Sequence, residues 1–229
     1  VPLEILRGFG KLGGNLLIMP TLYIVGTPIG NLSDMSERAK NTLSSVDVIL
    51  CEDTRVTGKL LHAYEIDTKM MSYHQHSGGF KVKKIIELIE DGKNLALVTD
   101  AGTPTISDPG GKLVQELVAR FGDELVVSPI PGASAVIAAL SVAGFPADEF
   151  IFLGFPPHKK GRMTFFDRVA TLKSTVAMYE STHRIMKTMA EIQSRMPERQ
   201  LMIGRELTKM HETIYRGTAE EVIAKLETT

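Results

Sequence analysis

Short apolar runs alternate with longer segments that carry one apolar face along most of this chain. Residues 22–25 form a first apolar run rich in β-branched side chains, and a turn rich in glycine and proline follows at 26–31. Within 80–90 the apolar residues recur at the spacing of one helical face. Because strands that alternate with amphipathic helices are typical of βαβ units, we predict an α/β fold built on a largely parallel sheet.

The pattern predicts the following elements. Strands are expected at 22–25, 47–51, 69–73, 95–99, 125–127, 150–154, 175–179, 200–205 and 213–217. Helices are expected from Ser33 or Asp34 to Leu43, after 52–55 through Leu61, and at 80–90, 112–120, 135–143, up to about 172, 182–196 and from Ala219. The last two strands should be antiparallel, because their connection is too short for a parallel crossover.

Gly, Pro and Asp interrupt the apolar pattern at 144–149, which predicts a domain boundary there. We expect an N-terminal α/β lobe at 20–146 and a C-terminal α/β lobe at 147–229. We interpret residues 1–19 as a leader or an artificially added segment. A secretory signal is disfavoured, because the apolar run 16–19 is too short and no small-residue cleavage site follows it.

The composition narrows the classes of protein. The 229 residues are 43% hydrophobic and 23% charged, a balance typical of a globular protein. The apolar runs are shorter than the roughly 20 residues that cross a bilayer, so we predict no membrane span. A single cysteine, Cys51, excludes an intrachain disulfide and a thiolate metal cluster, which favours a cytoplasmic location. We expect Cys51 to be buried. With 26 basic and 27 acidic side chains, any RNA binding would need a local concentration of basic residues.

Four polar loops follow predicted strands, at 26–31, 52–55, 100–104 and 129–134. Ligands of open α/β sheets bind beyond the carboxyl ends of the strands. None of the loops matches the dinucleotide fingerprint or the phosphate-binding P-loop pattern. Glycine beside Asp, Thr and Ser favours a small polar ligand, although each loop taken alone could be an ordinary turn. His74 and His76 could bind a metal, but no third ligand is evident, and we predict no metal site.

Six motifs carry a resemblance to a known family. They are Thr-Leu-Tyr-Ile-Val-Gly-Thr-Pro-Ile-Gly-Asn-Leu at 21–32, Cys-Glu-Asp-Thr-Arg at 51–55, Asp-Ala-Gly-Thr-Pro-Thr-Ile-Ser-Asp-Pro-Gly at 100–110, Pro-Gly-Ala-Ser-Ala at 131–135, Tyr-Glu-Ser-Thr-His-Arg at 179–184 and Arg-Glu-Leu-Thr-Lys-Met-His-Glu at 205–212. Long, ordered and spread over 22–226, they closely resemble the bacterial ribosomal RNA small subunit methyltransferase I family, within the tetrapyrrole (corrin and porphyrin) methylase superfamily.

The resemblance implies two α/β lobes of the tetrapyrrole-methylase type with S-adenosylmethionine (S-adenosyl-L-methionine) in the cleft between them. It implies 2'-O-methylation of a cytidine in the decoding region of 16S rRNA, so the partners would be 16S rRNA or the small ribosomal subunit, and a homodimer. Members of the family normally continue with a further small segment beyond the equivalent of Thr229. Two rival functions stay open: methylation of a tetrapyrrole, and a non-catalytic module that binds the cofactor or RNA.

The resemblance assigns cofactor contacts to Pro28, Asp100, Gly102, Thr103, Ser134, Ala135, Tyr179, Leu207 and Gly217. A strong base is optional, but a nearby carboxylate or lysine can help to remove the 2'-hydroxyl proton, and the candidates next to strand ends are Glu52, Asp53, Glu180 and Lys209. Residues suited to phosphate or base contacts are Arg55, His183, Arg184 and Arg205. Paired carboxylates such as Glu52–Asp53 are most often helix caps or salt-bridge partners. The basic segment 159–162 is equally compatible with a solvated turn and with an RNA contact.

Overall fold

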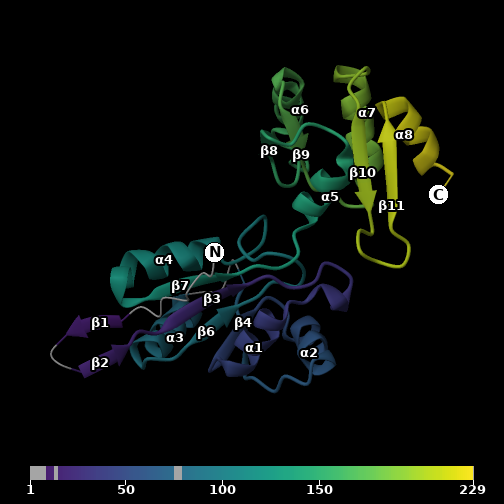
Figure 1. Cartoon of the computed structure of the whole chain (residues 1–229). Helices are drawn as coiled ribbons and strands as arrows, with labels where there is room; N and C mark the ends of the chain where they lie inside the picture. Colours follow the sequence, from purple (N-terminus) through teal and green to yellow (C-terminus); the bar gives the residue numbers. More distant parts are fainter. Residues whose placement is uncertain (1–8, 13–14, 75–78, 229) are drawn as a thin grey trace. The chain divides into compact units, whose positions relative to one another are not determined.

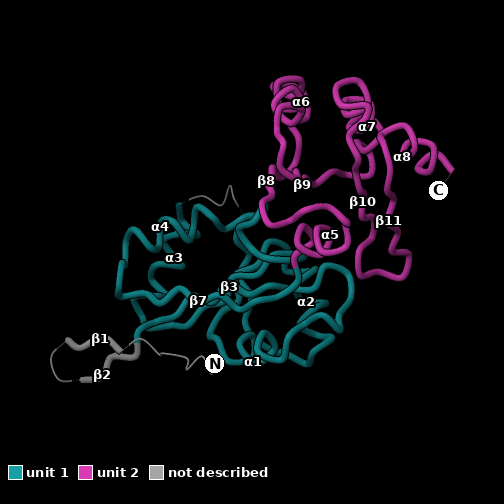
Figure 2. The backbone as a smooth tube through the Cα atoms, turned by 45° about the horizontal axis from the view of Figure 1, so that its top comes forward, with its two compact units in different colours: residues 1–133 teal, residues 134–229 magenta. Residues whose placement is uncertain are grey.

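The computed structural model of the chain describes residues 9–12, 15–74 and 79–228. It divides into two compact units, Val1–Ala133 and Ser134–Thr229 (Figure 2). The division comes earlier in the sequence than the boundary we expected at 146/147. The difference is the helix α5 (Ala135–Ala143), which belongs to the second unit.

The first unit is built on a five-stranded parallel sheet with the order β5-β4-β6-β3-β7 (Figure 1). Its strands are β3 (Thr21–Val25), β4 (Val48–Cys51), β5 (Met70–Ser72), β6 (Leu95–Leu97) and β7 (Val126–Ile130). Its helices are α1 (Glu37–Ser45), α2 (Thr54–Ala63), α3 (Gly79–Glu90) and α4 (Gly111–Phe121), with 3-10 turns η1 (Leu32–Asp34) and η2 (Gly122–Glu124). An antiparallel hairpin, β1 (Phe9–Leu12) and β2 (Asn15–Ile18), lies within the span we interpreted as a leader.

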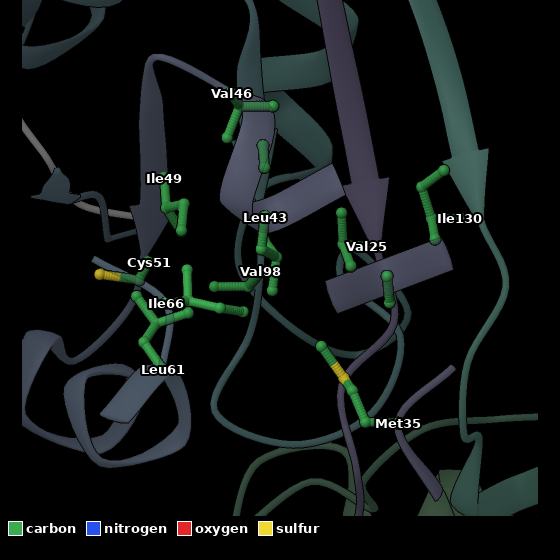
Figure 3. Packing of buried hydrophobic residues seen from close by; sticks show 12 residues of the cluster. Val25, Met35, Leu43, Val46, Ile49, Cys51, Leu61, Ile66, Val98 and Ile130 are labelled. Atoms are coloured by element: carbon green, nitrogen blue, oxygen red, sulfur yellow. The ribbon is translucent and has the colours of Figure 1, made fainter. Parts of the chain in front are cut away.

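Alternate side chains of the buried strands divide the core of this unit into two layers. On one face Val25, Ile49 and Cys51 pack against side chains of α1 and α2, as the sticks of Figure 3 show. On the opposite face Leu50 and Leu95 pack against α3 and α4. Both faces of the parallel sheet are therefore covered, as its continuous apolar strands require. Cys51 is fully buried as predicted, and burial raises the pKa of its thiol, which makes it a poor nucleophile.

The second unit contains a parallel strand pair and an antiparallel hairpin. The pair is β8 (Phe150–Phe152) and β9 (Thr175–Ala177), and the hairpin is β10 (Leu201–Arg205) and β11 (Thr213–Gly217). Besides α5 the helices are α6 (Arg162–Thr171), α7 (Ile185–Arg195) and α8 (Ala219–Leu226). Met189, Tyr215 and Val222 form a small core between α7, β11 and α8. The antiparallel pairing of the last two strands confirms the prediction.

The sequence placed the first helix too early. Asn31 accepts a hydrogen bond from the amide of Ser33 and opens the separate turn η1. The Ser36 hydroxyl then accepts one from the amide of Ala39, 3.1 Å away, so Ser36 caps α1 in place of Ser33 or Asp34. No helix among the described residues is long and apolar enough to cross a membrane.

Candidate active site

The loops after β3 and β7 meet at two glycines. The amide of Gly26 donates to the carbonyl of Ile130 at 3.0 Å, which continues the pairing of the two strands. A Cβ atom on Gly132 would lie 2.6 Å from the carbonyl oxygen of Gly26, and one on Gly26 would lie 2.8 Å from Cα of Gly132. Only glycine fits at both positions, because the atoms that would clash belong to the backbone.

A buried threonine ties the loop after β3 to the loop after β6. Thr27 and Gly102 exchange two backbone hydrogen bonds, of 2.9 and 3.1 Å, and the Thr27 hydroxyl donates to the carbonyl of Thr99 at 3.2 Å. Gly102 has φ +91°, which favours glycine, and the hydroxyl of Thr103 donates to the carbonyl of Ala133 at 3.2 Å. Three strand-end loops are thus joined into one rigid edge, which holds Pro28, Gly102 and Thr103 together.

Carboxylates gather at the same edge. Asp100 is exposed near the start of the loop that follows β6, and its Oδ1 accepts a hydrogen bond from the amide of Asp53 at 3.3 Å. Asp53 caps α2 by accepting from the amide of Arg55, and it pairs with the guanidinium of Arg55 at 2.6 Å. These contacts with Arg55 hold the pKa of Asp53 well below its usual range. Asp53 therefore has the cap and ion-pair role that we kept as an alternative, and its ionised carboxylate is a weak base.

Glu52 differs from its neighbour. It is half-buried, and this burial, followed by the charge of Asp100, raises the pKa of its carboxyl, against a smaller opposing effect of His74. Burial and the charge of Glu52 likewise raise the pKa of Asp108. The negative charge of Asp100 thus acts on both Glu52 and Asp108, and the charge of Glu52 acts on Asp108 as well. Sequence reasoning did not single out Asp108 or Thr27, although both stand inside motifs that it quoted.

The loop between β6 and α4 is strained. Thr105 and Ser107 have φ of 74° and 62°, in the left-handed region that side chains with a Cβ rarely adopt. Each such residue costs of order 1–3 kcal/mol, and strain of this kind concentrates at functional sites. The strain therefore supports a binding role for the loop that begins at Asp100.

In the second unit the Tyr179–Arg184 motif is brought together with the β8–α6 connection. The ring of Tyr179 lies 4.9 Å from that of Phe152, centroid to centroid. The side chain of Glu180 is only 5% exposed, accepts a 2.5 Å hydrogen bond from the hydroxyl of Thr188, and lies 3.2 Å from Nε of Arg184. These contacts favour a structural role for Glu180 and Arg184 over the base and phosphate roles we predicted. His183 remains exposed.

The β10–β11 hairpin loop holds a further group of predicted residues. Leu207 folds back over Gly204, where an added Cβ would lie 3.0 Å from its side chain. Lys209 pairs with Glu206 at 3.0 Å, and Arg205 is exposed at the end of β10. The loop is also strained, because Glu206 and Thr208 have φ of 53° and 69°.

Three predicted cofactor positions lie at helix starts in the second unit. Ser134 is the N-cap residue of α5 but makes no capping hydrogen bond with its side chain, and Ala135 is the first helical residue. Gly217 precedes α8 with φ +141°, and a Cβ there would lie 2.3 Å from the carboxylate of Glu221. That carboxylate closes a capping box with Thr218, so the need for glycine at 217 has a local structural cause. In the described part of the chain no group of three or more His, Cys, Asp or Glu side chains forms a metal site, and His76 lies outside the described residues.

Comparison with known proteins gives a family. Residues 21–223 match the profile of the Tetrapyrrole (Corrin/Porphyrin) Methylases. The chain belongs to this family. Within the family it groups with proteins named ribosomal RNA small subunit methyltransferase I: it is 46% identical to the one from Synechocystis sp. over 209 residues, 90% of this chain and 74% of that protein. The Thermotoga maritima protein of that name is 40% identical over 91% of this chain and 93% of its own length. The resemblance we inferred from the motifs is confirmed, and this tetrapyrrole methylase family member is a methyltransferase.

Solved structures of the same fold are more distant in sequence. The cobalt precorrin-4 methyltransferase CbiF superposes with a TM-score of 0.65 over 91% of this chain and 89% of its own, at 19% identity. The methyltransferase CobJ gives 0.66 over 90% of each chain at 15% identity. These likenesses confirm the predicted α/β fold class of the tetrapyrrole-methylase type.

Proposed function

We propose that this methyltransferase transfers a methyl group from S-adenosyl-L-methionine to the 2'-hydroxyl of a cytidine in 16S ribosomal RNA of the small subunit. The proposal rests on the edge of the first unit where hydrogen bonds join the strand-end loops, with Asp100 exposed and Glu52 half-buried. The chain is also 40–46% identical to proteins named for ribosomal RNA methylation. The exposed side of this edge offers the polar groups that such a donor needs.

The residues at this edge fit the chemistry of the donor. A carboxylate such as Asp100 suits an ammonium group or ribose hydroxyls, and Gly102 lets polar backbone groups approach a ligand closely. Thr103 and the buried Pro28 line the same loops. In the second unit, Tyr179 and Leu207 offer apolar surface for an adenine, and Ser134 and Ala135 offer the amides of a helix start. When bound, S-adenosyl-L-methionine supplies a methyl group activated by a positively charged sulfur.

Of the four candidate bases, Glu52 is the one we propose for removal of the 2'-hydroxyl proton. Asp53 is held by Arg55, Glu180 by Arg184, and Lys209 by Glu206. Burial brings the pKa of Glu52 closer to neutrality, where a carboxylate is a stronger base than an ordinary glutamate. Most of the rate enhancement would come from holding the hydroxyl oxygen in line with the methyl group, so Glu52 makes an added contribution. Arg55, His183 and Arg205, all exposed, remain candidates for contacts to the RNA backbone.

Cytoplasmic location and a homodimeric state complete the proposal. The single cysteine is a buried free thiol, which fits a reducing compartment. The nine residues of α5 include one polar side chain, Ser141, yet Ile137 is 53% and Val142 41% exposed. An apolar helix of this kind is usually covered, and a second copy of the chain would cover it. Light scattering on the purified protein tests this, and a monomer at micromolar concentration would contradict it.

The experiment that tests the function is transfer of labelled methyl groups to purified small ribosomal subunits that lack their native modifications. The RNA is then digested to nucleosides and the product is identified by mass. We expect 2'-O-methylcytidine. Methylation of a corrin or porphyrin precursor, with none of RNA, would support the tetrapyrrole alternative, and cofactor binding without any product would support a non-catalytic module.

Glu52→Gln is the informative variant in single-turnover transfer. It should slow transfer by about 10²-fold, at the lower end of the usual contribution of general acid–base catalysis. Glu198→Gln, which removes a carboxylate from an exposed turn, is the matched control. Equal rates for the two variants would exclude Glu52 as the base.

A further inference from the structure

The connection between β8 and α6, residues 154–161, is held by two arginines that share one carboxylate. Arg162 is 3% exposed, and its Nη1 donates to the carbonyl of Pro157 at 3.1 Å. Arg184 donates from Nη2 to the carbonyl of Pro156. Glu180 lies between them, with its Oε2 at 3.8 Å from Nη1 of Arg162 and its Oε1 at 3.2 Å from Nε of Arg184. Consecutive carbonyls of the loop are thus fixed by one buried ionic network.

The network is completed by Thr188 and by the strand pair. The hydroxyl of Thr188 accepts from Nη2 of Arg162 at 2.6 Å and donates to Glu180 at 2.5 Å. The amide of Tyr179 donates to the carbonyl of Gly154 at 2.8 Å, which extends the pairing of β8 and β9 to the start of the loop. Burying the guanidinium of Arg162 and the carboxylate of Glu180 is costly, and the best-attested use of such a pair is to fix one specific conformation. The conformation fixed here is that of the loop 154–161.

This rigid loop presents both an aromatic ring and positive charge to solvent. Phe155 is 53% exposed, and its ring lies 5.4 Å from the ring of Tyr179, centroid to centroid. His158, Lys159 and Lys160 are exposed in the same loop. The sequence carries no carboxylate from 150 through 166, so the two lysines have no acidic neighbour along the chain. A packed but exposed aromatic ring and lysines in one loop are the combination with which proteins bind single-stranded nucleic acid.

We propose that the loop 154–161 is a contact surface for a single-stranded segment of the RNA substrate, in which Phe155 stacks on a base and Lys159 and Lys160 contact phosphates. The inference rests on the proposed function and names the part of the second unit that takes the substrate. In this arrangement Arg162, Glu180 and Arg184 are positioning residues that hold the loop. Unstacked bases and a phosphate backbone match both halves of the surface, because every base offers a π-face and every phosphate a negative charge.

Two variants of the full chain test the surface. Phe155→Ala should weaken binding to unmodified 16S rRNA by about 5- to 150-fold, the range measured for loss of one stacked base. The double variant Lys159→Ala/Lys160→Ala should reduce the slope of log affinity against log salt by about 1.4, because each phosphate contact to a single strand contributes about 0.7. Both should raise KM for RNA more than they lower kcat, with the affinity for S-adenosyl-L-methionine unchanged by calorimetry.

The matched control is Arg168→Ala/Lys173→Ala, which also removes two exposed positive charges from the second unit. Lys173 precedes β9, whereas the loop 154–161 lies beyond the carboxyl ends of β8 and β9, so the control sites are at the other end of the strands. Filter binding over a salt series, on proteins with matched melting temperatures, compares all variants with the parent. If the loop variants bound RNA with the affinity and salt slope of the parent, the proposed RNA contact at 154–161 would be refuted. An equal loss of RNA affinity in the control variant would refute it too.

The outcomes separate this inference from the proposed function. A parent protein that binds 16S rRNA but methylates no RNA contradicts the proposed function. The RNA affinities of the loop variants would then still test whether the loop 154–161 contacts RNA. A parent that methylates cytidine, with loop variants that bind and react as the parent does, contradicts the surface alone.

Discussion

Substitution of Gly132 by alanine is the sharpest test of the way the strand-end loops are joined. The added Cβ would lie 2.6 Å from the carbonyl oxygen and 2.8 Å from the Cα of Gly26, whereas ordinary contact begins at 3.4 Å. The distance between the new Cβ and the carbonyl oxygen of Gly26 must therefore grow by about 0.8 Å, which moves the backbones of residues 26 and 132 apart. Neither partner is a flexible side chain, so the shift has to pass into the loops after β3 and β7.

Two effects follow from such a shift. Overpacking of this kind typically costs about 1–3 kcal/mol of unfolding free energy, which lowers the melting temperature of a chain this size by roughly 2–12 °C. Displacement of site residues by about 1 Å can cost about 10²-fold in rate. Because Thr103 hydrogen-bonds to the carbonyl of Ala133, next to the substitution, the movement is transmitted to the loop of Asp100. We expect a moderately destabilised protein with a disproportionate loss of methyl transfer.

Single-turnover methyl transfer and thermal unfolding measure the two effects. Gly58→Ala is the matched control, because an added Cβ there meets only the tip of Met70 at 3.5 Å and lies inside α2. Alanine should stabilise that helix by about 0.5–1 kcal/mol and leave transfer unchanged. Gly132→Ala with parent-like stability would refute the close approach. Reduced stability with full activity would refute the idea that the joined loops hold the reactive geometry.

Three further predictions have defined outcomes. In the parent, the rate of methyl transfer should fall as the pH drops through the raised pKa of Glu52, because the base must be ionised; Glu52→Gln should abolish this fall. Above that pKa the ionised Glu52 destabilises the folded parent, so the variant should there be the more stable protein. An unchanged pH profile of the rate and an unchanged melting curve would contradict the two expectations. Glu180→Ala should lower the free energy of unfolding in urea by about 1–3 kcal/mol, because the Thr188 hydroxyl loses its acceptor and Arg162 keeps only the carboxylate of Glu191, 3.9 Å away; a loss below 1 kcal/mol would refute the ionic network. Ser36→Ala should lower the free energy of unfolding by about 1 kcal/mol, because it removes the N-cap of α1, whereas Ser33→Ala should leave it nearly unchanged. The reverse order in urea unfolding would show that Ser36 is not the cap.

Much of the fold was predictable because each element carries its own signal. The apolar runs of the buried strands and the one-sided pattern of α3 are local properties, and the structure has both where the sequence predicts them. The start of α1 was not predictable to the residue, because Asn31, Ser33 and Ser36 are all good caps. Only the geometry of the preceding turn decides that Ser36 takes the role.

The boundary between the units depended on contacts that are distant in sequence. The guanidinium of Arg216 donates to the carbonyl of Ala143 at 3.4 Å and to that of Val142, at the end of α5. These bonds span more than seventy residues and attach α5 to the second unit. Local composition instead marked the Gly and Pro residues after α5, which end the helix but do not separate the units.

For the site, the sequence indicates candidate loops, but it does not show how the side chains in those loops are paired. Glu52 and Asp53 are adjacent and chemically alike, yet the ion pair with Arg55 lowers the pKa of one while burial raises that of the other. Lys160 and Arg162 stand in one basic segment, and the first is exposed while the second is buried. The sequence shows which residues are charged but not which of them form ion pairs in the fold. Whether a charged side chain is paired decides whether it is available as a base or an RNA contact or has a structural role.

Backbone strain gives an independent indication of which loops matter. In the described part of the chain, five residues other than glycine have positive φ, and four of them lie in two loops, Thr105 and Ser107 in one unit and Glu206 and Thr208 in the other. Glycine would relieve each at once, at a gain of the order of 1 kcal/mol or more per residue. Both loops belong to motifs that carried the family resemblance. Glu206 uses its side chain within the folded chain, in the ion pair with Lys209. For Thr105, Ser107 and Thr208, the simplest physical account of the strain is a contact with a bound donor or RNA.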